Sequence, residues 1–202
     1  VNYGQAYQLR ESIVGPVVST IRRALAEQEG SILVFLPGQR EIRAVARQLA
    51  DGLDAETQQQ LLIAPLYGGL SLERQQQAME PAPDGKRKVV LSTNLAETSL
   101  TIEGIDCVID SGLERILEYD PSSAMNRLST HAISQDSADQ RSGRAGRLSA
   151  GTCYRLWSSR QQQRLARHSL AEILHSDLSS LVLELSNWGV SQPDELSWLD
   201  IP

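Results

Sequence analysis

The 202-residue sequence has few of the residues that cross-link a small protein through disulfides or a metal ion, and it lacks the long apolar runs that anchor a protein in a membrane. It contains two cysteines, Cys107 and Cys153, and three histidines, too few for a disulfide framework or a cysteine-rich zinc site. No apolar run approaches the roughly 20 residues of a membrane span, and no charged-then-apolar leader opens the chain. We therefore expect a cytoplasmic protein without a membrane contact. Its start at Val1 instead of methionine indicates a piece of a longer chain.

A phosphate-binding loop of the form Gly-x-x-x-x-Gly-Lys-Ser/Thr is also missing, as is an Asp-Glu-Ala-His sequence. Residues 146–152 have the glycine spacing of such a loop, but Thr152 stands where the lysine should be. The chain therefore lacks the groups that hold Mg-ATP, and we expect negligible NTP hydrolysis from it alone.

Arginine is concentrated in one segment of an acidic chain. The net charge is −6, which argues against a general polyanion binder. Between residues 139 and 167 the only acid is Asp139, and the bases are Arg141, Arg144, Arg147, Arg155, Arg160, Arg164 and Arg167. Such a block predicts a local anion site, and the alternative is a solvated basic face.

Short apolar runs of strand length alternate with helical patterns along most of the chain. The strand candidates are residues 31–36, 61–66, 88–92, 106–110 and 151–157. Apolar residues at helical spacing occupy 12–29 and 42–49, and Ser71 is placed to begin a helix through about Met79. This alternation predicts an α/β fold with a doubly wound, mostly parallel sheet and helices on both faces. In such sheets, ligands bind beyond the carboxyl ends of the strands.

Two segments depart from that alternation. Residues 113–119 and 125–132 alternate polar and apolar around an Asp120-Pro-Ser-Ser turn, which predicts an inserted β-hairpin at about 113–133. From Ser158 the pattern becomes helical, with apolar residues at helical spacing between 177 and 186. We expect one domain over 1–160 and a helical tail over 161–202.

The sequence Gln140-Arg-Ser-Gly-Arg-Ala-Gly-Arg147 is the strongest chemical signal. On a helix, Arg144 and Arg147 would share one face, with Gly143 and Gly146 opposite. Two guanidinium groups so placed suit the oxygens of a polyphosphate, and Gln140 could orient a water or a phosphate oxygen. The alternative is an arginine-rich helix with surface ion pairs, for which few acids are near.

A second signal follows the strand candidate at 88–92. Hydroxyl and amide side chains crowd residues 92–101: Ser92, Thr93, Asn94, Thr98, Ser99 and Thr101. Such groups at the end of a strand commonly donate to phosphate and sugar oxygens. The alternative is that they cap helices.

Four stretches resemble, in chain order, the motifs of one helicase family. Motif IV resembles Leu33-Val-Phe-Leu-Pro-Gly-Gln-Arg-Glu-Ile42, and motif IVa resembles Pro65-Leu-Tyr-Gly-Gly-Leu-Ser71. Motifs V and VI resemble the two signals described above, after residue 91 and at 140–147. The chain is similar to the second RecA-like domain of the DEAH/RHA helicases of superfamily 2, over about residues 31–157. A bacterial branch of that family is the most similar. The resemblance implies a RecA-like fold, ATP-dependent RNA unwinding, and a tail that leads into a winged-helix-like domain.

The resemblance also implies roles at the ATP site. Arg144 and Arg147 match the arginine fingers that reach the γ-phosphate held by the first RecA-like domain, and Gln140 matches the glutamine near the attacking water. Ser99 and Thr101 match residues that sense the nucleotide. ATP or another NTP with Mg²⁺ would be held mainly by the first RecA-like domain, which this chain lacks.

Toward nucleic acid, Thr93 and Asn94 match the pair that binds the backbone of single-stranded RNA, largely without regard to sequence. The hairpin matches one that separates strands. The implied partners are RNA and the first RecA-like domain, with no membrane, and the protein is expected to be a monomer.

Two positions depart from the family pattern. Met79 stands where an aromatic residue often stacks on the nucleotide base. A thioether can pack on a π face, although an ordinary core methionine is an equal alternative. Glu103 stands where the family has an aspartate, and a ribose contact is expected of it.

His168, Glu172 and His175 would fall on one helical face, but surface residues are the better interpretation, and we expect no metal site. A rival function is a non-catalytic module that binds nucleic acid or protein on a helicase scaffold.

Overall fold

The computed structural model describes residues 1–4, 12–83, 85–98, 100–146 and 150–202. These residues form two compact units, one of residues 1–114 with 131–168 and one of residues 115–130 with 169–202. The first unit carries the candidate site and is described first. The domain limits expected at 1–160 and 161–202 stay a prediction.

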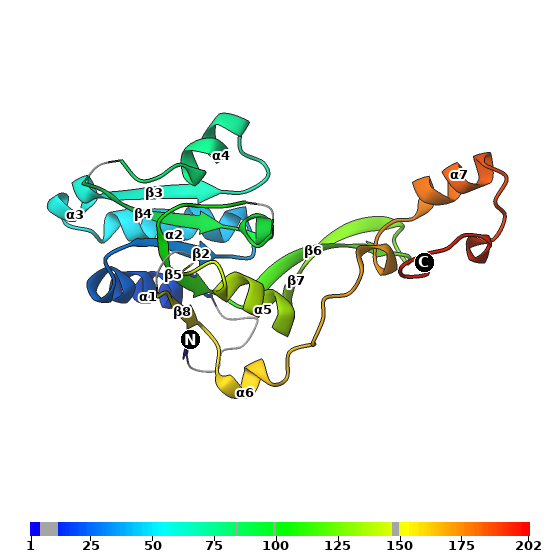
Figure 1. Ribbon diagram of the computed structural model, residues 1–202. Helices are drawn as coiled ribbons and strands as arrows, with labels where there is room; N and C mark the ends of the chain where they lie inside the picture. The colour runs from blue at the N-terminus through cyan, green and yellow to red at the C-terminus, as the bar shows by residue number, and fades with distance from the viewer. Residues whose placement is uncertain (5–11, 84, 99, 147–149) are drawn as a thin grey trace. The chain divides into compact units, whose positions relative to one another are not determined.

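A six-stranded sheet in which every pair of neighbours is parallel forms the centre of the first unit (Figure 1). Its order is β1-β8-β5-β2-β4-β3. The strands are β1 (Asn2–Tyr3), β2 (Ser31–Phe35), β3 (Leu61–Leu66), β4 (Arg87–Ser92), β5 (Ile105–Asp110) and β8 (Thr152–Arg155). β2 lies in the middle and all five of its residues are buried, as its continuous apolar run predicts. Pro65 lies in the edge strand β3, where a missing N–H is tolerated.

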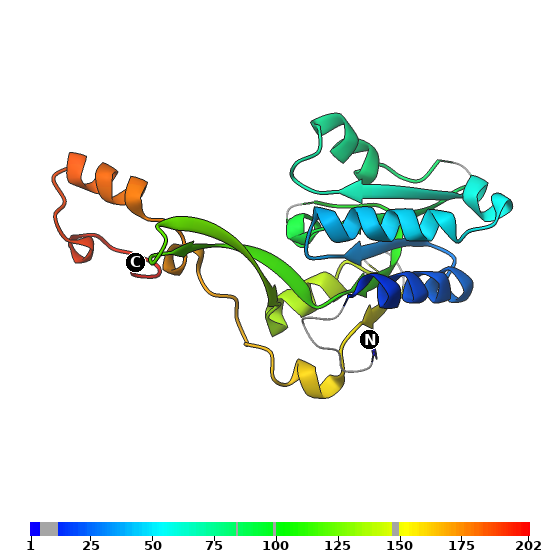
Figure 2. The same ribbon diagram turned by 180° about the vertical axis from the view of Figure 1, so that it is seen from behind.

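Helices cover both faces of this sheet (Figures 1 and 2). They are α1 (Val14–Glu27), α2 (Gln39–Asp51), α3 (Ala55–Gln60), α4 (Leu72–Met79), α5 (Gln135–Ser142) and α6 (Ser159–Gln162). Because strand side chains alternate, β4 sends Val89 and Leu91 to the core beneath α1 and α2, and Val90 to a second core with Ala78 of α4. The doubly wound α/β fold is confirmed.

The β-hairpin is also confirmed. β6 (Leu113–Asp120) and β7 (Met125–Ala132) form a separate two-stranded sheet. The Asp120 carboxylate closes the turn by accepting from the backbone N–H of Ser122 at 3.0 Å. Ala124 has a φ of +51°, in the left-handed region that favours glycine.

The tail after residue 160 is less helical than its sequence predicts. Beyond α6 it contains one α-helix, α7 (Ser179–Asn187), and two 3₁₀ turns, η2 (Glu172–Leu174) and η3 (Pro193–Glu195). One reason lies at residues 166 and 167. The carbonyls of Ala166 and Arg167 accept from the backbone N–H groups of Gln135 and Asp136, at 2.8 and 3.2 Å. Backbone groups used in this way cannot continue a helix.

None of the helices in the described parts of the chain is both long enough and apolar enough to cross a lipid bilayer.

Both cysteines are expected to be unreactive in the folded protein. Cys107 and Cys153 are buried in the sheet, and burial raises the pKa of each thiol to about 12. At pH 8 the thiolate fraction is then about a thousandfold lower than for a free thiol. We expect a colorimetric disulfide reagent to titrate two thiols in denaturant and none in native buffer. Rapid titration of either thiol without denaturant would show that the sheet opens at β5 or β8.

Candidate functional site

Thr93 and Asn94 lie at the carboxyl end of the sheet, directly after β4. The Thr93 backbone N–H donates to the carbonyl of Leu66 at 3.3 Å, and its hydroxyl accepts from the N–H of Leu95 at 3.5 Å. Thr93 thus caps the 3₁₀ turn η1 (Asn94–Ala96), so the capping alternative is realised at this residue. Asn94 is exposed, and buried Ala96 anchors the turn beneath it.

Arg141 is a fully buried charge near these residues, and sequence reasoning counted it only as one member of the arginine block. Its side chain is 1% exposed and stacks over the ring of Phe35, with 5.0 Å from the guanidinium carbon to the ring centre. It donates to Glu97 at 2.8 Å and to Asp110 at 3.1 Å. It also donates to the carbonyl of Leu113 at 3.2 Å, at the start of the hairpin. Arg141 therefore links the segment after β4, the end of β5 and the base of the hairpin.

These carboxylates decide the charge state of Arg141. Burial alone would lower its pKa, but Asp110 and Glu97 hold that pKa above the ordinary value for arginine. Both carboxylates thus stabilise the charged guanidinium, with Glu97 accepting from Nε and Asp110 from Nη1.

Arg144 lies in a turn and not on a helix, so the predicted helical pair of Arg144 and Arg147 is wrong in its geometry. α5 ends at Ser142, and Gly143 follows as its cap. Gly146 then has a φ of +72°, which a right-handed helix excludes. Its N–H donates to the carbonyl of Ile105 at 3.2 Å, which ties the turn to the start of β5.

The Arg144 guanidinium faces the segment after η1. It donates to the carbonyls of Leu100 at 2.7 Å, Thr98 at 2.6 Å and Glu97 at 2.9 Å through Nε. The two chemical signals of the sequence, residues 92–101 and 140–147, are therefore in direct contact through Arg144.

The other candidate residues fall into two groups along the sheet. α4 runs back from the carboxyl end, so half-buried Met79 at its end lies near the amino end of β4. Exposed Thr101 and Glu103 precede β5. The turn that carries Arg144 is tied to Ile105 at the start of β5. Met79, Thr101, Glu103 and this turn therefore lie toward the amino ends of the strands, one strand length from Thr93 and Asn94. Of these candidate residues, only Thr93 and Asn94 lie at the carboxyl ends of the strands, where ligand residues were expected to gather.

Gln140 is exposed on the last turn of α5, while Ser99 and Arg147 lie outside the described residues.

The arginine block divides by burial. Arg141 is inside, and so is Arg155, which donates to Asp139 at 2.7 Å and to the hydroxyl of Tyr3 at 3.1 Å. Arg160, Arg164 and Arg167 are exposed and form the solvated face that was the alternative. A single anion site made by the whole block is therefore excluded.

No helix carries His168, Glu172 and His175 on one face, so that expectation is wrong. His168 lies before the 3₁₀ turn η2 and its Nδ1 is 2.5 Å from the carboxylate of Asp136. Among the described residues, no group of three or more His, Cys, Asp or Glu side chains is placed to hold a metal ion.

Comparison with known proteins decides the family. A model of the helicase conserved C-terminal domain matches residues 16–149, more than half of the chain. The chain belongs to the helicase C-terminal domain family.

This helicase domain is similar to proteins described as ATP-dependent RNA helicases or probable ones. It is 51% identical over 178 residues to the ATP-dependent RNA helicase HrpB of Escherichia coli (strain K12), which covers 88% of this chain and 22% of that protein. It is 41% identical over 176 residues to the human probable ATP-dependent RNA helicase DHX34, covering 87% of this chain and 15% of that protein. The helicase domain thus spans about a quarter or less of these relatives.

Solved structures agree on the fold. The whole chain matches a crystal structure of the E. coli DExH-box NTPase HrpB with a TM-score of 0.88 and 45% identity, over 25% of that chain. A crystal structure of the Escherichia coli DEAH/RHA helicase HrpB gives a TM-score of 0.90, again with 45% identity over 25% of its length. The RecA-like fold and the resemblance to DEAH/RHA helicases are confirmed.

Proposed function

We propose that this helicase domain is the C-terminal motor domain of a longer, cytoplasmic, monomeric ATP-dependent RNA helicase. It would complete the ATP site of a first RecA-like domain and bind the backbone of single-stranded RNA. The observation that carries the proposal is the contact of Arg144 with the carbonyls of Glu97, Thr98 and Leu100. Through it, the turn that would sense the γ-phosphate is joined to the segment that begins with Thr93 and Asn94.

The residues present fit one side of a nucleotide triphosphate only. Arginine side chains supply positive charge for phosphate oxygens, but the lysine that binds the phosphates and the acidic pair that holds Mg²⁺ are missing from the sequence. Arg144, Arg147 and Gln140 would therefore face a γ-phosphate held with Mg²⁺ by the first RecA-like domain. Met79 would pack on the base, Glu103 would contact the ribose, and Ser99 and Thr101 would sense the nucleotide.

At the carboxyl end of the sheet, Thr93 and Asn94 would bind phosphate and sugar. Such contacts carry no sequence information and weaken with salt. Since η1 and the Arg144 turn belong to one packed unit, closing the ATP cleft would move the RNA-binding pair as a rigid body.

The first test separates this half-site from a complete enzyme. The isolated chain should show no RNA-stimulated ATP hydrolysis, whereas a longer protein that carries the first RecA-like domain should hydrolyse ATP. Hydrolysis by the isolated chain would contradict the half-site. A longer protein that binds RNA but never hydrolyses NTP would favour the rival, a non-catalytic binding module.

A further inference from the structure

Lys88, the second residue of β4, is a charged side chain with no exposed surface. Burying an ammonium group is costly unless polar groups surround it. Its Nζ donates to the carbonyl of Ala78 at 2.8 Å and also to the carbonyl of Glu80. These carbonyls belong to the residues on either side of Met79, so Lys88 holds the backbone at that position from both sides.

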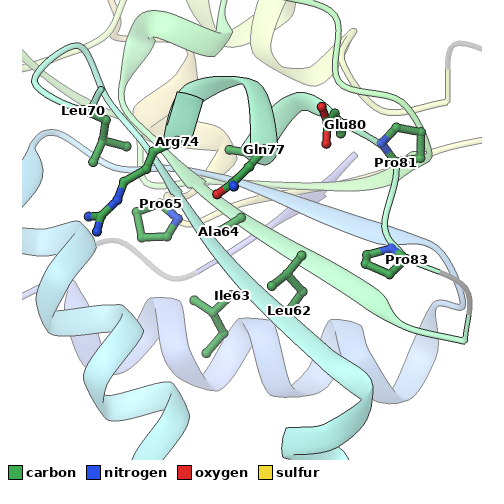
Figure 3. Close-up of a pocket in the computed structure, with 11 residues that line it drawn as sticks. Leu62, Ile63, Ala64, Pro65, Leu70, Arg74, Gln77, Glu80, Pro81 and Pro83 are labelled. Carbon is green, nitrogen blue, oxygen red and sulfur yellow. The ribbon is translucent and has the colours of Figure 1, made fainter. Parts of the chain in front are cut away.

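Little else fixes the end of α4. The helix has eight residues and Ala78 is the only one of them that is buried. An open groove of about 430 Å³ lies between α4 and the edge strand β3 (Figure 3). Its wall includes Leu62 and Pro65 from β3, Gln77 from α4, and Pro81 and Pro83 beyond the helix. A helix with so little apolar packing beneath it depends on polar contacts for its position.

The ammonium also suits this place electrostatically. The last carbonyls of a helix have no partner within the helix and carry partial negative charge. A cation buried beside them is stabilised, and three N–H donors allow it to reach two carbonyls at once.

We propose that Lys88 is a positioning residue for the nucleotide base, which holds Met79 in place so that its thioether packs on the base. The inference rests on the proposed function, because it needs Met79 to face a bound NTP. Lys88 itself touches no nucleotide and acts through the backbone of residues 78–80.

The test is a double-mutant cycle in the longer protein, with steady-state hydrolysis measured at saturating RNA. Lys88→Met removes the ammonium but keeps a similar volume, and Met79→Ala removes the thioether. Each should raise KM for ATP about two- to tenfold, the range of a sulfur–aromatic contact, with kcat changed less than about twofold. The double variant should have the same KM as Met79→Ala.

Ser31→Ala is the matched control. The Ser31 hydroxyl accepts from the backbone N–H of Lys88 at 3.2 Å, so its loss disturbs the same residue without touching the ammonium. Its KM should equal that of the wild type. If Lys88→Met does not fold, Lys88→Gln, which removes the charge and has two N–H donors in place of three, is measured by the same criterion.

The outcomes separate the inference from the function beneath it. A KM that rises for Met79→Ala but not for Lys88→Met overturns the inference alone. If Lys88→Met raises KM by the same factor in the wild type and in Met79→Ala, Lys88 has a general structural role, and the inference is overturned as well. No change for Met79→Ala rejects the base contact, and an inactive wild-type protein rejects the proposed function; the inference fails with either.

Discussion

Replacing Arg141 by methionine is expected to lower the free energy of unfolding of the first unit by about 3–5 kcal/mol, the usual cost of removing one partner from a buried ion pair. The substitution leaves Asp110, which is fully buried, and Glu97 without the cation that both accept from. It also removes the stacking over Phe35 and the donor to the Leu113 carbonyl. Several named contacts are lost at once, and the fully buried Asp110 carboxylate that is left behind cannot reach water.

This loss can be measured by urea unfolding of the chain, followed by circular dichroism and by the exposure of Cys107 and Cys153, which lie in the first unit. Arg141→Lys should keep part of the stability, since a lysine restores the charge but not the planar fork. Arg160→Ala, at an exposed position, should change the free energy of unfolding by less than about 0.5 kcal/mol. Equal stability of Arg141→Met and the wild type would show that the carboxylates find other partners.

In the longer protein, Arg144→Ala is expected to reduce kcat for ATP hydrolysis by about a thousandfold or more, the range seen when an arginine finger is removed. The reason is that the developing charge on the transferred phosphoryl group loses a guanidinium donor. RNA affinity should fall much less, because Thr93 and Asn94 keep their own anchors in Leu66 and buried Ala96. Single-turnover hydrolysis and RNA titration by fluorescence anisotropy measure the two effects.

Asn94→Ala is the counterpart of Arg144→Ala, because it is expected to lower RNA affinity and to leave kcat nearly unchanged. It should weaken RNA binding about three- to tenfold, as expected for one lost hydrogen bond, with kcat at saturating RNA nearly unchanged. Arg164→Ala, exposed in the same arginine-rich stretch, should change neither quantity. If Arg144→Ala hydrolyses ATP normally but binds RNA poorly, Arg144 is a clamp for the carbonyls of residues 97–100 and the finger assignment fails.

Strands β2, β3, β4, β5 and β8 of the first unit and its helices α1 and α2 could be predicted from sequence because burial sets their patterns. The continuous apolar run of β2 reflects a central strand buried on both faces, and the proline near the end of β3 reflects an edge. The hairpin likewise follows from alternation around the Asp120 turn. In each of these, local pattern and tertiary position agree.

The interior of the site could not be read from the sequence in the same way. Arg141 and Arg144 stand in one short motif with the same formal charge, yet one is buried among carboxylates and the other donates to backbone carbonyls. Which arginine turns inward depends on where α5 ends, and Gly146, with a φ of +72°, excludes a right-handed helix through the end of the motif. Lys88 gave no signal at all, because a single lysine in a strand is ordinarily a surface residue.

The strand order has a consequence for how the domain forms on the ribosome. β2 pairs with β4 and β5, and β1 pairs with β8, with Asn2 opposite Tyr154. None of these partners is the next strand in the chain, so each pairing must wait for a long intervening segment to emerge. Loop closure over such distances is slow, and parallel sheets of this kind are among the slower folds. Until β8 has been made, β5 keeps an open edge, and its apolar run of Cys107 to Ile109 is open to pairing with other chains during synthesis.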